Sequence, residues 1–503
     1  MKSSTTILNL WPFPSTWLIT ILFCLLTLTL LFLTVNASKH GLSKAPGPPS
    51  FPIIGNIWRL KPKSAWFELT RLKERYVYFH GLGNSVLVLN SMDAIKDLLE
   101  KRSNKYSNRP VFTVVGTMMG LGQSMPLLPY GPEWRASRKL AHVALSPAAV
   151  AKYHHVQEDL TVLLLRDFLD NPQEFFSHVR LAAGRIILVI TYGLSIQSAD
   201  NNYITDAEDT MQMIGESTVP GAFLADLLPI LKHFTFLPFH KTAAKGRETI
   251  ENFVSRPLLH VKHEMASEKA PESLTRDLLE QENEDERQHE YRVKWTSGAL
   301  YGAGAETTYT TVLVFILAMA MYPEVQKKAF SEVKAYLSTP RLVRIIDHHN
   351  LPYVAAVIKE CLRWHPALPL TEDDIYNNYL IPRGTVVIPN VWAIAFAPHP
   401  QYDPQEFIPE RFLDKTHNVI DPLTYAFGFG KRVCPGKALA ENSVFAIIAN
   451  LLLTFDIQPP GGGVHPPNFG PNLVSYPEPF KCRFIPRPGM EQLVRTMAAE
   501  VDI

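Results

Sequence analysis

The ten residues FGFGKRVCPG, from Phe427 to Gly436, constrain this chain more than any other segment. Three glycines and a proline surround a single cysteine, and two cations precede that cysteine. A buried structural cysteine packs as a small hydrophobe and needs none of this backbone freedom. Glycine lets a backbone turn tightly and come close to another group. The segment therefore predicts that some group approaches this loop closely and uses the thiol of Cys434.

The composition is that of an ordinary folded protein with room for one large core. The chain has 503 residues, of which 46% are hydrophobic and 19% charged, and its formal net charge is +1. This balance gives no general attraction to nucleic acid, so we expect no nucleic-acid partner. The four cysteines, Cys24, Cys361, Cys434 and Cys482, are widely spaced, which argues against a disulfide scaffold and a structural zinc site. We therefore expect the body of the protein to lie in a reducing compartment.

The N-terminus carries a long apolar segment. Residues Leu18–Val35 contain no charge, and as a helix they would span about 27 Å, close to the thickness of a bilayer core. A cleaved signal peptide is the alternative, but the apolar run is long for one and a single lysine precedes it. We favour an uncleaved transmembrane anchor. Lys39 and Lys44 follow the run, which places the larger C-terminal part in the cytosol.

A proline-rich segment, KAPGPPSFPIIGN (Lys44–Asn56), follows the apolar run. Proline fixes φ and disfavours helix in the residue before it, so we expect a stiff, extended stalk. The chain thus divides into a short lumenal segment (1–16), a transmembrane anchor (17–36), a stalk (37–56) and a catalytic body (57–503).

The body's pattern predicts a mainly α-helical fold with small β-sheets, an α+β class. Val77–Asn90 alternates around a turn, and Tyr379–Asn390 does so around Pro382-Arg383-Gly384, so we expect two hairpins. A helix from Trp295 to Tyr322 is apolar nearly all round and should lie in the middle of the fold.

The centre of this apolar helix contains residues that a buried helix normally avoids. Gly302 and Gly304 each cost about 1 kcal/mol relative to alanine in a helix interior. A buried glutamate such as Glu306 costs more unless it has a partner. Such departures from local preference are expected at functional sites. We therefore expect chemistry at this point of the helix.

Taken together, the motifs resemble those of the cytochrome P-450 superfamily, the haem-thiolate monooxygenases. The loop Phe427–Gly436 resembles the family's cysteine-ligand loop. Four further motifs match in order: WRASR (Trp134–Arg138), AGAETT (Ala303–Thr308), ECLR (Glu360–Arg363) and PERF (Pro409–Phe412). The resemblance covers the whole chain and implies the P-450 fold. The anchor and stalk fit the eukaryotic microsomal branch, and the residues around the motifs resemble those of fungal members.

The resemblance implies haem b as the cofactor, with the Cys434 thiolate as the axial ligand of its iron. Phe427 would shield the thiolate, while Gly428 and Gly436 would let the loop wrap closely beneath the porphyrin. Backbone N–H groups of the loop would point at the sulfur. The remaining cofactor-binding residues that the family implies are Gly304 on the central helix and, beside the haem propionates, Trp134, Arg138 and Arg432.

Two catalytic residues are implied on the central helix. The Thr307 hydroxyl would hold water against dioxygen and relay protons, which Glu306 would supply. For Thr307 the alternative is a hydrogen bond from its hydroxyl to the backbone carbonyl one turn earlier. A structural role is implied for Glu360, Arg363 and Arg411, which would form a buried charge cluster that locks the segment under the haem loop and retains the haem.

The implied reaction inserts one atom of dioxygen into an organic substrate and releases the other as water. The electrons would come from NADPH through a separate flavoprotein, an NADPH-cytochrome reductase. The expected pocket walls are apolar and rich in methionine, so we expect a lipophilic small-molecule substrate. These walls are Phe112–Leu128, Val219–Leu224, Leu300–Gly304 and Leu368–Leu370. We favour a tailoring step in secondary metabolism, for example of a terpenoid, at the endoplasmic reticulum membrane with the body in the cytosol.

Two segments are shorter than in the family this chain resembles, one after Leu370 and one near Tyr76. The first gap removes a strand that lines the pocket and often binds a propionate, and His365 is a less favoured substitute for that strand's basic side chain. Three alternatives therefore stay open: a xenobiotic-oxidising monooxygenase, a reductase-independent haem-thiolate isomerase or dehydratase, and an inactive haem-binding protein. Against the isomerase stands the presence of Glu306 and Thr307, a pair that such members often lack.

Overall fold

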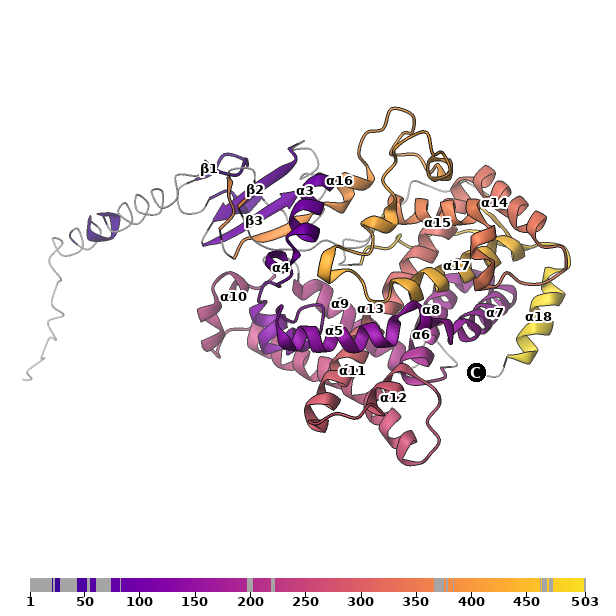
Figure 1. Ribbon diagram of the computed structural model, residues 1–503, viewed down its shortest axis with the longest axis horizontal. Coiled ribbons are helices and arrows are strands. Elements are labelled where there is room, and N and C mark those ends of the chain that lie inside the picture. The colour runs from indigo at the N-terminus through magenta and orange to yellow at the C-terminus, as the bar shows by residue number, and fades with distance from the viewer. Residues whose placement is uncertain are drawn as a thin grey trace, which may run out of the picture.

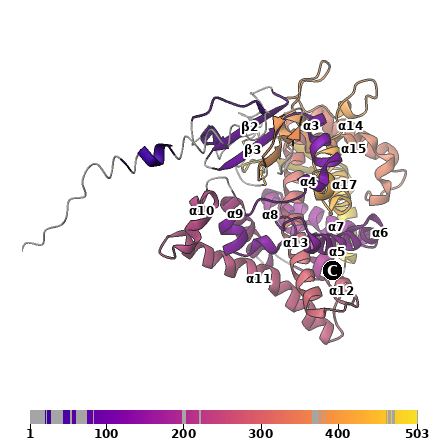
Figure 2. The ribbon, with the colours of Figure 1, turned by 60° about the vertical axis from the view of Figure 1, so that its left-hand side comes forward.

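A bundle of helices makes up most of the molecule in this computed structural model, and the sheets that contain β1, β2 and β3 lie at one side of it (Figure 1). Figure 2 shows the same division after a rotation, with the long α11 along the edge opposite the sheets. The structure describes residues 20, 23–27, 43–51, 55–59, 74–81, 83–196, 202–218, 222–365, 375–376, 379–382, 384–461, 463, 468–469 and 474–501. The predicted class, mainly α with small sheets, is confirmed.

The described α-helices are α3 (Met92–Ile95), α4 (Ser103–Tyr106), α5 (Pro132–Leu145), α6 (Pro147–Ala151), α7 (His154–Asp170), α8 (Phe175–Tyr192), α9 (Asn202–Thr218), α10 (Leu224–Leu227), α11 (Phe239–Ala266), α12 (Leu274–Leu279), α13 (Glu286–Met321), α14 (Pro323–Tyr336), α15 (Pro352–Trp364), α16 (Val391–Ala395), α17 (Lys437–Thr454) and α18 (Met490–Glu500). The described strands are β1 (Ser43–Lys44), β2 (Tyr76–Gly81), β3 (Asn84–Leu89), β4 (Ile375–Tyr376), β5 (Tyr379–Leu380), β6 (Val386–Pro389), β7 (Phe455–Gln458) and β8 (Arg483–Pro486).

The first predicted hairpin is confirmed. Strands β2 and β3 pair antiparallel, with Val77 opposite Val88 and Phe79 opposite Val86. These four side chains are buried together on one face of the sheet. The alternation of apolar and polar residues in this segment therefore correctly predicts a half-buried strand pair.

The second predicted hairpin is wrong. Strand β5 pairs with β1 and β4, whereas β6 pairs parallel with β3, so the two halves of Tyr379–Asn390 belong to different sheets. The segment does turn, because the Thr385 N–H donates to the Pro382 carbonyl at 3.2 Å and Gly384 has φ of +88°. The apolar alternation of β6 is satisfied by β3 instead, since Val387 is fully buried against one core cluster and Val386 packs on another.

Helix α13 runs through the middle of the helical bundle and begins earlier than the sequence predicts. It starts at Glu286, where the Asp285 carboxylate accepts a 3.0 Å hydrogen bond from the Gln288 N–H and so caps the helix. Val312 to Ala320 are almost completely buried. Helices α5, α8, α11 and α17 all pack against it. The predicted central position of this apolar helix is confirmed.

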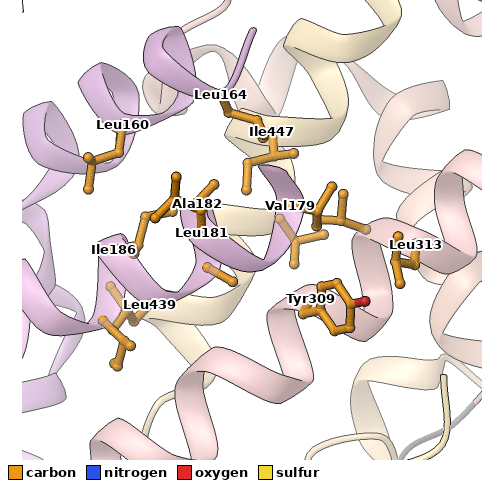
Figure 3. Close-up of a cluster of buried hydrophobic side chains, with 14 of the residues drawn as sticks. Leu160, Leu164, Val179, Leu181, Ala182, Ile186, Tyr309, Leu313, Leu439 and Ile447 are labelled. Carbon is orange, nitrogen blue, oxygen red and sulfur yellow. The ribbon is translucent and has the colours of Figure 1, made fainter. Parts of the chain in front are cut away.

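Four helices meet in the main core. Figure 3 shows side chains of α7, α8, α13 and α17 directed into one apolar cluster, among them Leu164, Val179, Leu313 and Ile447. Since α17 follows the cysteine loop and α13 carries the glycine–threonine segment, this core fixes the two segments relative to each other.

Three described helices are long and apolar enough to cross a membrane, namely Pro172–Tyr192, Glu286–Met321 and Lys437–Thr454. About two thirds or more of each apolar window is buried inside the protein, so their hydropathy reflects the core. Of the predicted anchor 17–36, the described residues are Thr20 and Phe23–Thr27, which are helical. Phe23, Leu25 and Leu26 are exposed. The rest of that anchor lies outside the described residues, and the anchor stays a prediction.

The described part of the stalk lies along strand β2. The Pro46 carbonyl accepts a 2.8 Å hydrogen bond from the Tyr78 N–H, and the Asn56 side chain donates to the Pro48 carbonyl at 2.8 Å. The same asparagine accepts from the His80 N–H at 2.7 Å. The proline-rich segment is therefore attached to the sheet by hydrogen bonds.

Candidate active site

The loop that holds Cys434 is closed on itself by a short hydrogen bond. The Cys434 N–H donates to the Phe427 carbonyl at 2.7 Å, and α17 begins three residues after the cysteine. Gly428 has φ of +80° and Gly430 has φ of +53°. A Cβ on Gly430 would lie 2.1 Å from the Leu99 carbonyl oxygen. Glycine is therefore required at 430 both by conformation and by the close approach of the neighbouring backbone.

The Cys434 thiol is exposed although protein surrounds it. Its side chain is accessible to solvent, yet burial among protein atoms raises its pKa. A group with both properties lies in a recess rather than on an open surface. The Gly436 N–H bonded to the thiol and the charges of Arg138 and Lys437 act in the opposite direction and lower the pKa. Burial outweighs these contributions, so the net shift of the Cys434 pKa is upward, while the two cations leave a positive potential around the sulfur.

Arg138 projects from α5 without a protein partner in the described part of the chain. It is half-buried, burial lowers its pKa, and the nearby Cys434 raises it. A half-buried guanidinium with unused donors is prepared to bind an anion. Trp134, one turn earlier on α5, is buried, and its indole N–H also has no partner among the described residues. Both residues thus keep polar groups available, and their contact with haem propionates stays a prediction.

The guanidinium of Arg432 makes more hydrogen bonds within the protein than the sequence predicts. Its guanidinium donates to the carbonyls of Ser107, Met125 and Leu128 at 2.6, 3.1 and 2.8 Å. It also lies 4.5 Å from the ring centre of Trp134. These contacts attach the segment before α5 to the cysteine loop. A contact between Arg432 and a haem propionate stays a prediction. In that contact the guanidinium would bind the propionate as well as the three backbone carbonyls.

The middle of α13 is accessible on one face. Ala303 is exposed and Thr307 is partly exposed, whereas Thr308 to Thr310 are buried. The Thr307 hydroxyl donates to the Ala303 carbonyl at 2.9 Å. Residues four apart share a face of a helix, so Ala303 and Thr307 lie on the same accessible face of α13. The intrahelical hydrogen bond that the sequence left open as an alternative is present.

Glu306 points to the neighbouring face of α13. Together with Ala305 and Tyr309 it lines a cavity against Arg180 of α8 and Glu208 of α9. Burial raises the pKa of Glu306, the negative charge of Glu208 raises it further, and Arg180 lowers it. Successive helix residues are rotated by about 100°. The carboxyl group of Glu306 and the hydroxyl of Thr307 therefore start from adjacent faces of α13.

Gly304 allows α13 to approach α8 closely. A Cβ at this position would lie 2.6 Å from Cδ1 of Ile187. Gly298 has the same relation to Val254 of α11, also at 2.6 Å. The packing explains both glycines by helix–helix contact, and a contact of Gly304 with a cofactor stays a prediction.

The structure brings Glu360, Arg363 and Arg411 together in a fully buried cluster. The Arg363 guanidinium donates to both Glu360 oxygens at 2.7 and 2.9 Å, and Arg411 Nε lies 3.1 Å from the same carboxylate. The remaining donors of the arginines reach backbone carbonyls of 395–408, including Pro404 and Glu406. The cluster therefore holds this irregular segment in place.

Two polar residues of the site, Arg180 and Glu208, do not belong to any motif that the sequence analysis identified. They lie on α8 and α9, far in sequence from Glu306. One signal was present, because the apolar stretch FFSHVRLAAGRIILVITY carries arginines that a buried carboxylate would need as partners. Of the predicted pocket walls, Leu368–Leu370 and 219–221 lie outside the described residues.

A family model described as cytochrome P-450 matches residues 45–484. The chain is 34% identical over 494 residues to the cytochrome P-450 monooxygenase COX2 of Coprinopsis cinerea, covering 93% of this chain and 94% of the relative. It is 37% identical over 476 residues to the cytochrome P-450 monooxygenase claR of Ampulloclitocybe clavipes, covering 90% and 88%. These relatives are fungal proteins, in agreement with the resemblance noted in the sequence.

Solved structures of a zebra fish cytochrome P-450 share the fold. The structure with progesterone superposes with a TM-score of 0.70 at 22% identity, covering 84% of this chain and 99% of that chain. The structure with abiraterone gives a TM-score of 0.68 at 21% identity, with the same coverage. At these identities the likeness shows the fold alone.

Proposed function

This chain belongs to the cytochrome P-450 family and is a haem-thiolate monooxygenase, and we propose that it oxidises a lipophilic small molecule in a tailoring step of secondary metabolism. The observation that carries the proposal is that two groups stay accessible on segments that pack together, since α13 contacts α17, the helix that follows the cysteine loop. The two groups are the thiol of Cys434 and the face of α13 that holds Thr307.

The residues present fit a haem. Haem held through a cysteine thiolate supplies the activation of dioxygen. Cys434 offers an accessible sulfur that already accepts an N–H from Gly436. Arg138 and Trp134 offer unused donors in the described part of the chain, suited to the carboxylates of the haem edge. We expect these four residues to hold the cofactor.

Thr307 and Glu306 are the proposed proton-handling residues. The Thr307 hydroxyl donates its hydrogen to the Ala303 carbonyl, so its oxygen keeps lone pairs that can accept a hydrogen bond from water. Burial favours the protonated form of Glu306, because its pKa is raised. A proton leaving the Glu306 carboxyl group would pass to a bridging water and then to the water held at Thr307.

An apolar substrate suits the segment Phe112–Leu128. Val114, Val115 and Met119 in it are packed in the main core, whereas the apolar side chains of Phe112, Met118 and Leu121 are only partly buried. The nearby carboxylate of Asp226 is occupied, since it accepts the N–H groups of Thr113 and Val114 at 2.6 and 3.1 Å. Such a wall offers apolar contact rather than a charge, which favours a poorly charged substrate such as a terpenoid.

The proposed partners are an NADPH-cytochrome reductase and the endoplasmic reticulum membrane. Monooxygenation needs two electrons for each dioxygen, and a separate flavoprotein would deliver them. The exposed apolar residues Phe23, Leu25 and Leu26 in the helical piece 23–27 support a membrane contact at the N-terminus. The body would then lie on the cytosolic side.

The test is expression of the full chain with a fungal NADPH-cytochrome reductase and a panel of lipophilic precursors. We expect products heavier than a precursor by one oxygen atom, formed only with NADPH, and ¹⁸O from ¹⁸O₂ should appear in them. The reduced protein with carbon monoxide should show the red-shifted absorption of a thiolate ligand, and Cys434→Ala should abolish it.

The open alternatives give different results. Conversion without NADPH and reductase, at unchanged mass or with loss of water, would indicate an isomerase or dehydratase. The thiolate band without conversion of any precursor would indicate an inactive haem-binding protein. Conversion of many unrelated foreign compounds at comparable rates would favour the xenobiotic-oxidising enzyme.

A further inference from the structure

Lys437 is the first residue of α17 and follows Cys434 by three positions. The first turn of α17 contains no acidic residue. The N-terminus of a helix carries a partial positive charge, so a lysine is disfavoured there. Residues that depart from a local preference are expected at functional sites. The position of Lys437 therefore indicates a role outside the helix itself.

The ammonium group of Lys437 is held against the cysteine loop. Its Nζ donates a 3.0 Å hydrogen bond to the Leu423 carbonyl and lies 5.3 Å from the centre of the Phe427 ring. A cation over an aromatic ring is attracted by the negative face of that ring. The side chain of Lys437 is 36% exposed, so its charge is partly withdrawn from water. Lys437 thus connects the start of α17 to Phe427.

Phe427 and Lys437 both act on Cys434. The Cys434 N–H donates to the Phe427 carbonyl at 2.7 Å, so these two residues are joined across the loop. Burial raises the pKa of the Cys434 thiol, and the positive charge of Lys437 is among the contributions that lower it. Lys437 therefore acts on the sulfur through its charge and on Phe427 through contact.

The negative charges near Lys437 neutralise it only in part. Among the described residues, Glu441 has the one carboxylate within 4 Å of Lys437 Nζ, and the two atoms are 3.9 Å apart. Asp421, two residues before Leu423, is paired instead with Lys359 at 2.7 Å. The charge of Lys437 therefore remains available to the sulfur.

We propose that Lys437 is a positioning residue for the haem thiolate, which holds Phe427 in the cysteine loop and raises the reduction potential of the bound haem iron through its positive charge. The step concerned is the uptake of one electron by ferric haem from the proposed reductase, and Lys437 forms and breaks no covalent bond in it. The reduced centre carries one negative charge more than the oxidised centre, so a nearby cation favours it. The inference rests on the proposed function, because it needs Cys434 as the ligand of the iron.

The test is the midpoint reduction potential of the purified, haem-loaded full chain, titrated with dithionite without reductase, NADPH or substrate. Lys437→Gln removes the charge, so we expect the midpoint to move to a more negative potential. Lys437→Arg keeps the charge and the contact with the ring, and should restore a midpoint near that of the wild type. Glu441→Gln removes the nearby negative charge and should move the midpoint to a more positive potential.

Two further variants make the result specific. Phe427→Leu removes the aromatic ring, and Lys437→Gln should shift the midpoint less in this background than in the wild type. Lys139→Gln is the matched control for net charge. Lys139 is exposed on α5, and its charge is not among those that act on Cys434, so its replacement should leave the midpoint near that of the wild type.

A negative shift in Lys437→Gln that Lys437→Arg reverses supports the proposal. An unchanged midpoint in Lys437→Gln, or an equal shift in Lys437→Arg or Lys139→Gln, would overturn it. An equal effect of Lys437→Gln with and without the Phe427 ring would overturn the positioning of Phe427. If Lys437→Gln fails to bind haem, a midpoint in Glu441→Gln that is unchanged or more negative is the contradicting result.

A role in docking the reductase gives a different result. Slower electron transfer from the reductase to Lys437→Gln at an unchanged midpoint would overturn the proposal and assign Lys437 to the partner surface. Failure of the proposed function shows elsewhere, as absence of the thiolate band and of oxygenated product in the wild type, so the two failures are distinguishable.

Discussion

The Thr307 hydroxyl is bound to the backbone carbonyl of Ala303, 2.9 Å away and one turn earlier in α13. This hydrogen bond does not exclude a role in proton transfer. A hydroxyl that donates its hydrogen still accepts on its oxygen, and both residues lie on the accessible face of the helix. The bond fixes the direction of the hydroxyl while the oxygen remains available.

Replacing Thr307 by valine should therefore reduce product formation much more than stability. Valine keeps the shape and removes the hydroxyl, and loss of a proton relay costs about 10²-fold or more. Loss of one partly exposed hydrogen bond costs only about 1 kcal/mol. The measurement is product formed per NADPH consumed. Thr311→Val, which removes a similar bond of 3.0 Å to the Thr307 carbonyl, is the matched control and should retain activity. Equal losses in the two variants would contradict the proposal.

Alanine substitutions at Gly428 and Gly430 test the structure of the cysteine loop, because the space around the two glycines differs. Alanine at 430 would have positive φ and a Cβ 2.1 Å from the Leu99 carbonyl oxygen, so backbone has to move. Alanine at 428 would have positive φ but no atom closer than 3.6 Å. We expect Gly428→Ala to cost about 1–2 kcal/mol and Gly430→Ala distinctly more, with loss of haem. Urea unfolding and the haem content of purified protein measure both, and a milder effect at 430 than at 428 would refute this reading of the loop.

Arg138 should control haem retention. Arg138→Gln removes a half-buried guanidinium that has no other partner in the described part of the chain. A hydrogen bond to a charged group contributes about 1.5–3 kcal/mol, so haem should transfer to apomyoglobin roughly ten times faster or more. Arg135→Gln is the control, because Arg135 is exposed on the same helix and lies against Tyr130. Indistinguishable transfer rates in the two variants would remove Arg138 from the cofactor site.

The sequence predicts those parts of the site that depend on local backbone or on an obligatory partner. The loop around Cys434 is of this kind, because its glycines have positive φ or close neighbours. The pairing of β6 was not predictable from its own pattern, since an alternating strand does not specify which neighbour it joins. Arg180 and Glu208 were not predicted as part of the site, for a related reason. They come close to Glu306 because α8 and α9 pack on α13. The spacing of residues along one segment does not predict a contact between three helices.

The charge cluster around Glu360 should be essential for stability. Glu360 is completely buried and holds two arginines, whose charges would be left without a partner in Glu360→Gln. Breaking a buried pair typically costs about 3–5 kcal/mol. Glu491→Gln breaks an exposed pair with Arg495 and should cost less than about 1 kcal/mol. The midpoint of urea unfolding compares the two, and similar midpoints would show that the buried cluster contributes no more than surface charge.

His365 should make the protein less stable in mild acid. Burial lowers its pKa to about 4 from the ordinary 6.5, while its ring donates to the Ser475 carbonyl at 2.7 Å and stacks on Phe469 at 3.9 Å. As the pH falls through 6.5, this histidine therefore becomes protonated in the unfolded chain while it stays neutral in the folded protein. The free energy of unfolding should fall steadily between about pH 6.5 and pH 4, by ~3 kcal/mol in total from this group, and should not depend on it above pH 7.

The measurement is urea unfolding of the wild type, His365→Gln and His263→Gln across this range. The first variant should lose the pH-dependent part of the stability, because glutamine does not titrate, although its stability near pH 7 will be lower without the ring stacking. His263 is exposed on α11, so its replacement should leave the wild-type slope in place. A wild-type slope that persists in His365→Gln would show that other groups cause the acid sensitivity and would contradict the lowered pKa of His365.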